Sequence, residues 1–283
     1  MIRTQRVASS ELHLGDMRLD GWFYCSDGGQ ARQVLTASGL QLCSLVDLCV
    51  AEGLYIPHRF KRPYVRSKEN GTPYVTGSSI QLADPLQGCA YLSNKLLISG
   101  REKLMLKPGT ILVTCSGDIG RVVYVNNLFE EAVGSPDLLR VEPDPTKVLP
   151  GYLYTFLSSP MGRGLLSRGT YGGVIPHIET AHVLDLPVPR LEDKTEAAIH
   201  RCIVDAALRR EEANWKLTQA RSRVYDVTSL PRYELAPVGR NLKGVRTFSV
   251  SQTIIGHRLE ARFHDTFVRE MQRVIRSNPT CEW

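Results

Sequence analysis

The sequence predicts an α+β protein in which a β-rich globular module is followed by one long, coiled-coil-forming helix. Residues 71–140 hold short apolar runs separated by turns that contain Gly or Pro, which is typical of strands. Residues 192–224 contain neither Gly nor Pro and carry apolar side chains at helical spacing. The opening pattern of the chain also returns near its end. These observations divide the chain into five predicted parts: an opening segment at 1–48, the module at 49–190, the long helix at 191–226, a connector at 227–248 and the start of a second repeat at 249–283.

Composition and charge narrow the class of protein. The chain has 283 residues, of which 42% are apolar, so it can bury one large core or two smaller ones. Its net charge is +6, and residues 55–70 contribute +4 of this, because five Lys and Arg side chains outweigh Glu69. A local basic surface on a nearly balanced chain favours contact with a polyanion at one face.

Cysteine usage and hydropathy predict a cytoplasmic protein. The seven cysteines are odd in number and form no CxxC pair, which argues against a disulfide framework or a zinc ribbon and favours a reducing compartment. No apolar run has the length of a membrane span, and the first residues lack the apolar stretch of a signal peptide.

The first elements are weakly patterned. Residues 17–38 predict a helix that is interrupted at Gly28 and Gly29, and residues 40–50 predict a strand or a short helix. The basic stretch 55–70 contains two prolines, which exclude a regular helix, so we expect an ordered loop there.

The β-rich part contains one clear hairpin. Residues 71–80 predict a turn and a short strand. Ile111 to Cys115 predict a buried strand, Ser116 to Gly120 a turn, and Val122 to Val125 the returning strand.

The end of the module is predicted to be helical and then extended. Residues 150–168 predict a helix that Pro160 breaks or kinks. Residues 170–180 predict a glycine-containing loop, and residues 181–189 a short closing strand.

The long helix carries a narrow apolar seam. Alternating steps of four and three residues select seven apolar side chains and one exception, Arg210. The predicted partner-helix seam is Ile199, Ile203, Ala206, Ala213, Leu217, Ala220 and Val224. Such a seam is typical of a coiled coil, and 33 helical residues span roughly 50 Å. The seam needs a partner helix from a second unit of this chain or from another chain. The outer face would offer further side chains to partners: Arg209, Glu211, Glu212, Lys216 and Arg221.

An internal repeat links the two ends of the chain. A shift of 240 places the segment 14–35 on the segment 254–275. The matched positions are Arg18 with Arg258, Leu19 with Leu259, Asp20 with Glu260, Phe23 with Phe263, Val34 with Val274, and Leu35 with Ile275. This predicts a tandem architecture whose second unit begins after the connector.

The succession of these stretches resembles the DNA specificity subunits of type I restriction–modification systems. The stretches that carry the resemblance are 71–80 (GTPYVTGSSI), 106–125 (LKPGTILVTCSGDIGRVVYV), 151–177 and 183–199, followed by the long helix. The resemblance covers roughly residues 12–226 and restarts near 249. Two features depart from the family: Glu192-Asp193-Lys194 lacks the glutamine that often follows an acidic pair, and a full subunit has two complete modules. The chain is therefore either a truncated subunit or a natural half-subunit that pairs with its own copy.

The resemblance implies a target-recognition module that binds double-stranded DNA and performs no catalysis. No cofactor or metal is expected. The sequence agrees, since it has no Walker lysine loop, HExxH, GxGxxG after a strand or adenine-methyltransferase motif. The implied partners are methyltransferase (modification) subunits and, in some complexes, restriction or translocase subunits, within a methylation-based phage defence. A homodimer through the long helix would be the partner arrangement of a half-subunit.

The candidate DNA-binding residues fall into three groups. Arginine suits contact with base edges and lysine suits phosphate, while a glycine turn lets backbone N–H groups approach a phosphate. The candidates are Arg59, Lys61, Arg62, Tyr64, Arg66 and Lys68 in the basic stretch, Ser116 and Arg121 at the hairpin turn, and Arg163, Arg168 and Tyr171 before and within the glycine loop.

Two other functions stay open from the sequence. The chain could be a recognition domain detached from a single-chain restriction–methylation enzyme, whose catalytic motifs lie elsewhere. It could instead be a coiled-coil assembly scaffold whose basic stretch is only solvated surface. Salt-dependent DNA binding separates the scaffold from a DNA-reading subunit, and co-purification with a methyltransferase separates the subunit from the detached domain.

Overall fold

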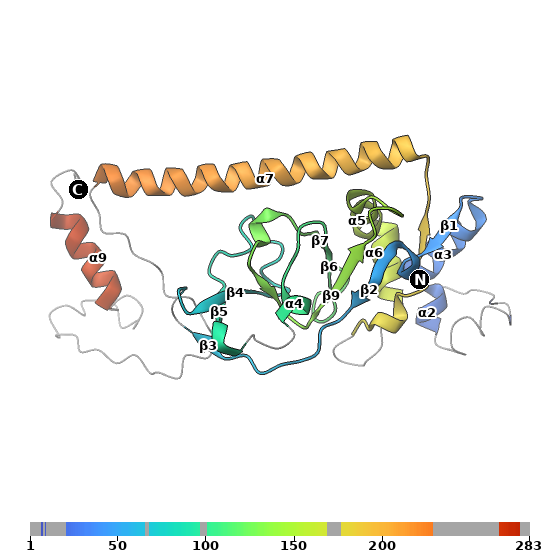
Figure 1. Ribbon diagram of the computed structural model, residues 1–283, viewed down its shortest axis with the longest axis horizontal. Helices are drawn as coiled ribbons and strands as arrows, with labels where there is room; N and C mark the ends of the chain where they lie inside the picture. Colours follow the sequence, from blue (N-terminus) through green and yellow to red (C-terminus); the bar gives the residue numbers. More distant parts are fainter. Residues whose placement is uncertain are drawn as a thin grey trace. The chain divides into compact units, whose positions relative to one another are not determined.

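The computed structural model confirms an α+β fold followed by a long helix (Figure 1). It describes residues 7, 9, 21–65, 68–96, 101–168, 177–228 and 266–277. The chain separates into two compact units, Met1–Glu211 and Glu212–Trp283. The first unit holds the described part of the opening segment, the whole described module and the first half of the long helix.

The module contains two four-stranded sheets and a short two-stranded ribbon. One sheet has the order β2-β9-β6-β7, the other has the order β3-β5-β4-β8, and β1 pairs with β10. All pairs are antiparallel except β4 with β8, which are parallel. The strands are β1 (Leu42–Ser44), β2 (Cys49–Tyr55), β3 (Tyr64–Val65), β4 (Gly71–Val75), β5 (Ala90–Ser93), β6 (Ile111–Thr114), β7 (Val122–Tyr124), β8 (Val133–Gly134), β9 (Leu138–Pro143) and β10 (Pro187–Pro189).

The sheet that contains β6 and β9 is the central layer of the module. Successive side chains of a strand point to opposite faces, and in β6 all four are buried. Ile111 and Val113 join the core against the helices, while Leu112 joins a second core with Val75 of the other sheet. Both faces of this sheet are therefore covered, which explains why Ile111, Leu112 and Val113 form an unbroken apolar run in β6.

Helices cover one face of the central sheet. They are α3 (Asp27–Ala37), α5 (Pro150–Ser158) and α6 (Pro160–Arg168), and α2 (Gly21–Cys25) directly precedes α3. Shorter helical turns are η1 (Val46–Leu48), η2 (Asn94–Leu96), α4 (Arg101–Leu104), η3 (Asn127–Phe129) and η4 (Thr180–His182). The predicted break at Pro160 is confirmed, since α5 ends at Ser158 and α6 begins at Pro160. The predicted strand or short helix at 40–50 is resolved into β1, η1 and the start of β2.

The prediction that glycines interrupt the opening helix is wrong. The helix breaks at Ser26, whose side chain accepts a hydrogen bond from the Gly29 backbone and caps α3. Gly28 lies inside α3 against α6, where a Cβ atom would lie 2.1 Å from the Gly164 carbonyl oxygen. Ala31 and Leu35 of the same helix are in the module's core. The opening segment thus supplies part of that core.

The predicted hairpin is confirmed in position. Strands β6 and β7 pair from Ile111 with Tyr124 to Val113 with Val122. The turn between them needs two left-handed backbone positions, and glycines occupy both, with φ of 74° at Gly117 and 73° at Gly120.

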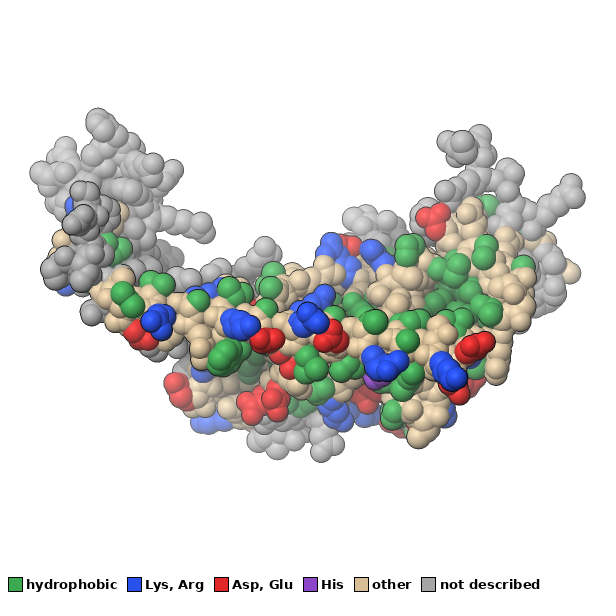
Figure 2. Space-filling view, turned by 90° about the horizontal axis from the view of Figure 1, so that it is seen from above, with side chains coloured by type: hydrophobic (Ala, Val, Ile, Leu, Met, Phe, Trp, Pro, Cys, Tyr) green, Lys and Arg blue, Asp and Glu red, His purple; other side chains and the backbone are tan. Residues whose placement is uncertain are grey.

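The long helix is one unbroken element, α7 (Asp193–Thr228), of 36 residues. Figure 2 shows basic and acidic side chains alternating along it with apolar side chains between them. Its exposed surface includes two ion pairs at i,i+4 spacing, Arg209 with Asp205 and Lys216 with Glu212. Among the described residues of α7, only Glu196 is buried.

The second unit contains a helix that matches α3. Helix α9 (Thr266–Ser277), shifted back by 240, occupies positions 26–37, and α3 occupies 27–37. The internal repeat seen in the sequence is therefore repeated in secondary structure. The other matched positions, 18–20 and 258–263, lie outside the described residues, as do the loop 169–176 and the connector from residue 229.

Six cysteines lie in the described part of the chain, and all six are free thiols. No described helix combines the length and the apolar character that crossing a bilayer requires. Among the same residues, no three His, Cys, Asp or Glu side chains are grouped to hold a metal ion.

Candidate nucleic-acid interface

The basic stretch forms the connection between β2 and β3 and rests on an aromatic cluster. Phe60 and Tyr64 pack edge-on against the buried ring of Tyr74, with ring centroids 6.5 and 6.2 Å away. These contacts anchor the loop on the module through its aromatic residues. Arg59 and Lys61 are exposed. Strand β3 begins at Tyr64, so the predicted loop gives way to a strand in its second half.

Arg62 is held more firmly than its neighbours. Its guanidinium lies 5.6 Å from the centroid of the Tyr74 ring, and Nη2 is 3.5 Å from a carboxylate oxygen of Asp137. Both side chains of this ion pair are more than one third exposed, so the pair is weak in solvent. A phosphate could replace Asp137 as the partner of Arg62 at little energetic cost. Lys68 is exposed, and Arg66 lies outside the described residues.

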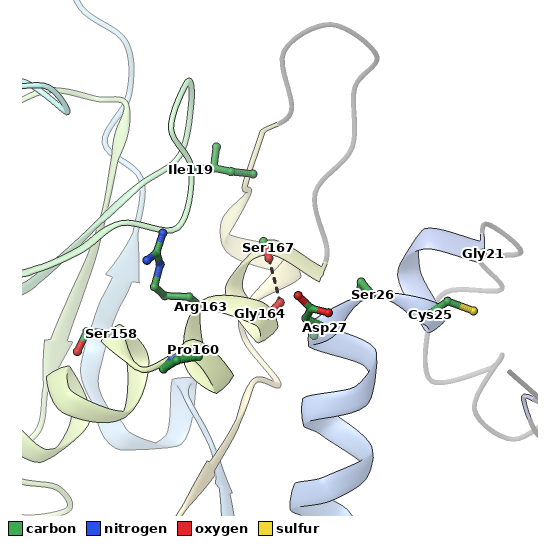
Figure 3. Close-up of a pocket in the computed structure, with 11 residues that line it drawn as sticks. Gly21, Cys25, Ser26, Asp27, Ile119, Ser158, Pro160, Arg163, Gly164 and Ser167 are labelled. Atoms are coloured by element: carbon green, nitrogen blue, oxygen red, sulfur yellow. Dashed lines mark hydrogen bonds between the residues drawn. The ribbon is translucent and has the colours of Figure 1, made fainter. Parts of the chain in front are cut away.

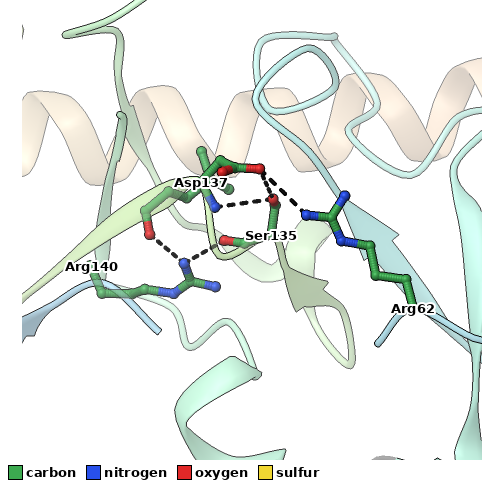
Figure 4. Close-up of polar contacts among 5 residues, drawn as sticks. Arg62, Ser135, Asp137 and Arg140 are labelled. Atoms are coloured by element: carbon green, nitrogen blue, oxygen red, sulfur yellow. Dashed lines mark hydrogen bonds and ion pairs between the residues drawn. The ribbon is translucent and has the colours of Figure 1, made fainter. Parts of the chain in front are cut away.

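A buried arginine supports the turn that presents Asp137 (Figure 4). Arg140 is 1% exposed, and its Nη1 donates to the backbone carbonyls of Ser135, at 2.7 Å, and Leu138. The Ser135 hydroxyl accepts from the Asp137 backbone N–H and donates to the Asp137 carboxylate. Burial lowers the pKa of Arg140 to about 10, which still leaves it protonated at neutral pH. Its Nε and Nη2 have no hydrogen-bond partner within the described part of the chain.

The second candidate group is at the turn of the β6–β7 hairpin. Ser116 is half-buried at the end of β6. Arg121 forms an ion pair with Asp118 and donates to the Gln81 side chain. Its positive charge is therefore compensated within the turn. The backbone N–H groups of Ile119, Gly120 and Arg121 are also bonded within the hairpin, to Gly117 and Thr114, so the turn holds few free donors for a phosphate.

The third group lies on α6 beside a pocket of about 810 Å³ (Figure 3). The pocket is lined by the start of α3, the hairpin tip at Ile119 and α6, including the exposed Arg163. Arg163 and the hairpin turn thus share one surface. Arg168 instead joins α6 to α2, since its guanidinium lies 3.9 Å from the centroid of the Phe23 ring and donates to the Phe23 carbonyl at 3.0 Å. Tyr171 lies outside the described residues.

The predicted seam of α7 is used in two ways. Ile199 packs against the module's core, and Ile203 is half-buried. Further along, Leu217 and Val224 are 51% and 57% exposed, and the three seam alanines are also exposed: Ala206, Ala213 and Ala220. The first two turns of the seam therefore lie against the module, while the rest presents an apolar strip to solvent. A partner helix for that strip stays a prediction.

Sequence reasoning missed a second face of α7 that binds the module through polar contacts. Glu196 accepts two hydrogen bonds from Arg190, both at 2.9 Å, and one from the Leu191 backbone N–H. His200 Nδ1 accepts from the Gly151 backbone N–H at 3.0 Å.

The same face continues to the middle of the helix. Glu211 accepts from both the backbone N–H and the side-chain amide of Asn127, each at 3.0 Å. The expectation that Glu211 serves the outer face is thus wrong. The available signal was the spacing of Glu196, His200, Ala207 and Glu211 along one side of the helix.

Comparisons with known proteins give a likeness in structure only. No protein-family model matches the sequence, and no curated protein matches it. The structure is similar to a crystal structure of a type I restriction–modification S subunit from M. genitalium, with 19% identity and a TM-score of 0.40 over 68% of this chain and 45% of that one.

Two further solved structures are similar over the same share of the chain. One is a structure described as the basis of complex assembly and conformational transition of the type I R-M system, with 13% identity and a TM-score of 0.41. The other is the HsdS subunit from Thermoanaerobacter tengcongensis, with 14% identity and a TM-score of 0.39. This chain covers 47% of each, so it spans about half the length of these proteins.

Proposed function

We propose that the chain is a non-catalytic DNA-recognition subunit of a restriction–modification or methylation-based defence complex. It would read one half of a two-part target and position methyltransferase subunits, which make the covalent change. One observation carries the proposal: a module with exposed cations is followed directly by an uninterrupted helix of 36 residues. The apolar strip of that helix is exposed beyond the module. The motif succession that resembles the specificity subunits points to the same function.

The exposed cations are suited to a duplex surface. Arg59 and Lys61 extend from a loop that is anchored by aromatic rings, so little backbone entropy is lost when they bind phosphates. Arg62 is preoriented by Tyr74 and Asp137. Phosphate contacts set the affinity and register of such a complex, and arginine contacts to base edges set its sequence preference.

The helix would serve as both spacer and assembly surface. At 1.5 Å per residue, 36 residues span about 54 Å, the length of roughly 16 base pairs. Its exposed Leu217 and Val224 would be covered by a helix from a second repeat or from a second copy of the chain. Charged side chains on the remaining faces would contact the methyltransferase subunits.

Salt-dependent binding to duplex DNA, together with co-purification with a methyltransferase, tests this proposal. Arg59→Ala or Arg62→Ala should lower affinity and reduce the slope of log K against log salt by about 0.9 for each phosphate contact removed. Lys147→Ala is the matched control, because Lys147 is also a surface cation but lies outside the candidate groups and pairs with Asp144. Equal effects of all three variants, or methyl transfer by the chain alone, would contradict the proposal.

A further inference from the structure

The turn between β8 and β9 holds Asp137 in a fixed place beside the basic stretch. The Asp137 carbonyl accepts from the Cys115 backbone N–H at 3.0 Å, which joins the turn to the end of β6. The Ser135 backbone N–H donates to the Val75 carbonyl at 2.8 Å, which joins the turn to β4. The buried Arg140 guanidinium holds two backbone carbonyls within and beside the turn. Because the turn is bonded to both sheets, the Asp137 backbone has little freedom to move.

The two side chains of the Arg62–Asp137 ion pair are both supported from behind (Figure 4). Asp137 Oδ2 accepts from the Ser135 hydroxyl at 3.2 Å and lies 3.5 Å from Arg62 Nη2. The Arg62 guanidinium rests on the ring of Tyr74, which is buried. Exposed ion pairs are usually weak partly because two mobile side chains must be held together. That entropic cost is reduced here, so we expect this pair to lie at the upper end of the range for exposed pairs.

A DNA phosphate and the Asp137 carboxylate would compete for the same donors. Both are oxyanions that accept charge-assisted hydrogen bonds from a guanidinium. A phosphate that binds Arg62 must take it from Asp137, and the carboxylate then remains beside a group of like charge. The exchange therefore lowers the affinity for every duplex, because phosphates are common to all sequences.

We propose that Asp137 competes with DNA phosphate for Arg62 and so weakens the hold of the module on duplex DNA of any sequence. This inference rests on the proposed function. Asp137 acts through Arg62 and touches no DNA itself. Phosphate contacts carry no direct sequence information, so weakening one of them leaves a larger share of the binding free energy to contacts with base edges.

The test measures how tightly the full chain binds a labelled duplex of arbitrary sequence, by fluorescence anisotropy at one low salt concentration. Asp137→Asn keeps an acceptor for the Ser135 hydroxyl and removes the negative charge. It should raise the association constant about 5-fold, the worth of an exposed ion pair at the upper end of its range. Asp137→Ala leaves Arg62 with no side-chain acceptor at this position and should raise the association constant at least as much.

Two comparisons separate competition for Arg62 from a general effect of charge. Asp144→Asn changes the net charge by the same unit, and Asp144 pairs with Lys147 at 3.6 Å, outside the candidate groups. It should raise the association constant by about 2-fold or less, since a screened surface charge acts weakly on DNA that does not contact it. In an Arg62→Ala background, Asp137→Asn should likewise give about 2-fold or less, because no guanidinium is left to release.

The outcomes separate this inference from the proposed function. A gain in affinity for Asp137→Asn and Asp137→Ala that is lost in the Arg62→Ala background supports the competition. If neither Asp137 variant gains more than Asp144→Asn, or if the gain is the same with and without Arg62, the inference is overturned while the proposed function stands. If wild type binds no duplex DNA at low salt, the proposed function itself fails, and the inference fails with it.

Discussion

Removing the carboxylate of Glu196 should unfasten the start of α7 from the module. Glu196 is nearly fully buried and accepts three hydrogen bonds, two from the Arg190 guanidinium and one from the Leu191 backbone, all at 2.9 Å. The hydrogen bonds to Glu196 raise the pKa of Arg190, so the guanidinium stays protonated at all ordinary pH values. In Glu196→Ala the guanidinium and the backbone N–H lose their acceptor.

The expected loss can be estimated from the burial of each partner. Breaking a buried ion pair by removing one partner costs about 3–5 kcal/mol. The Arg190 side chain is 21% exposed and regains part of its hydration, so we expect the lower end, about 3 kcal/mol of unfolding free energy. Glu212→Ala removes a glutamate from the same helix whose pair with Lys216 is exposed, and should cost about 0.3 kcal/mol.

Urea denaturation of the full chain, followed by near-ultraviolet circular dichroism, measures both variants under one condition. The decisive quantity is the difference in unfolding free energy between Glu196→Ala and Glu212→Ala, and not either value alone. Glu196→Ala could instead lower the unfolding free energy no more than Glu212→Ala does. The buried contact of Glu196 with Arg190 and Leu191 would then contribute nothing to holding α7 on the module, which would refute its predicted role.

Three further predictions follow from other contacts of the module. Gly151→Ala should cost about 1–3 kcal/mol in the same denaturation assay, because its Cβ would lie 2.7 Å from His200 Nδ1; a neutral effect would show that the helices separate freely. Partial burial lowers the pKa of His200, which accepts from Gly151 as the neutral imidazole, so its contribution to stability is present above about pH 6.5 and is lost as the pH falls through the lowered pKa. The stability difference between wild type and His200→Ala should therefore shrink in acid, and a constant difference would contradict this. Burial raises the pKa of Cys49 and Cys115 to about 12, so a thiol reagent at pH 8 should label exposed Cys202 in the native protein and leave both buried thiols intact, as peptide mass spectrometry would show.

Local patterns predicted the elements whose form depends on near neighbours. The Gly- and Pro-free run predicted α7, Pro160 predicted the break between α5 and α6, and the paired glycines predicted the β6–β7 turn. Each of these signals acts over a few residues, through backbone dihedrals or through a repeat of about 3.6 residues. The internal repeat was also visible, and helices α3 and α9 reproduce it.

Contacts between distant residues needed the folded chain. Gly28 reads as a helix breaker in the sequence, but inside α3 it allows close contact with Gly164, which is far away in the chain. The candidate nucleic-acid interface was likewise predicted only where local sequence determines it. The exposure of Arg59 and Lys61 follows from local composition, whereas the use of Arg168 to hold Phe23 does not.

Helix α7 shows both kinds of information in one element. Its existence, its length and its apolar seam follow from the order of residues 192–224, because helix formation and amphipathic periodicity are local properties. Which of its faces meets the module depends on where Asn127 and Gly151 are brought by the sheets and by α5. Those positions are set by packing over the whole core, so Glu211 reads as an ordinary surface charge until the fold brings Asn127 to it.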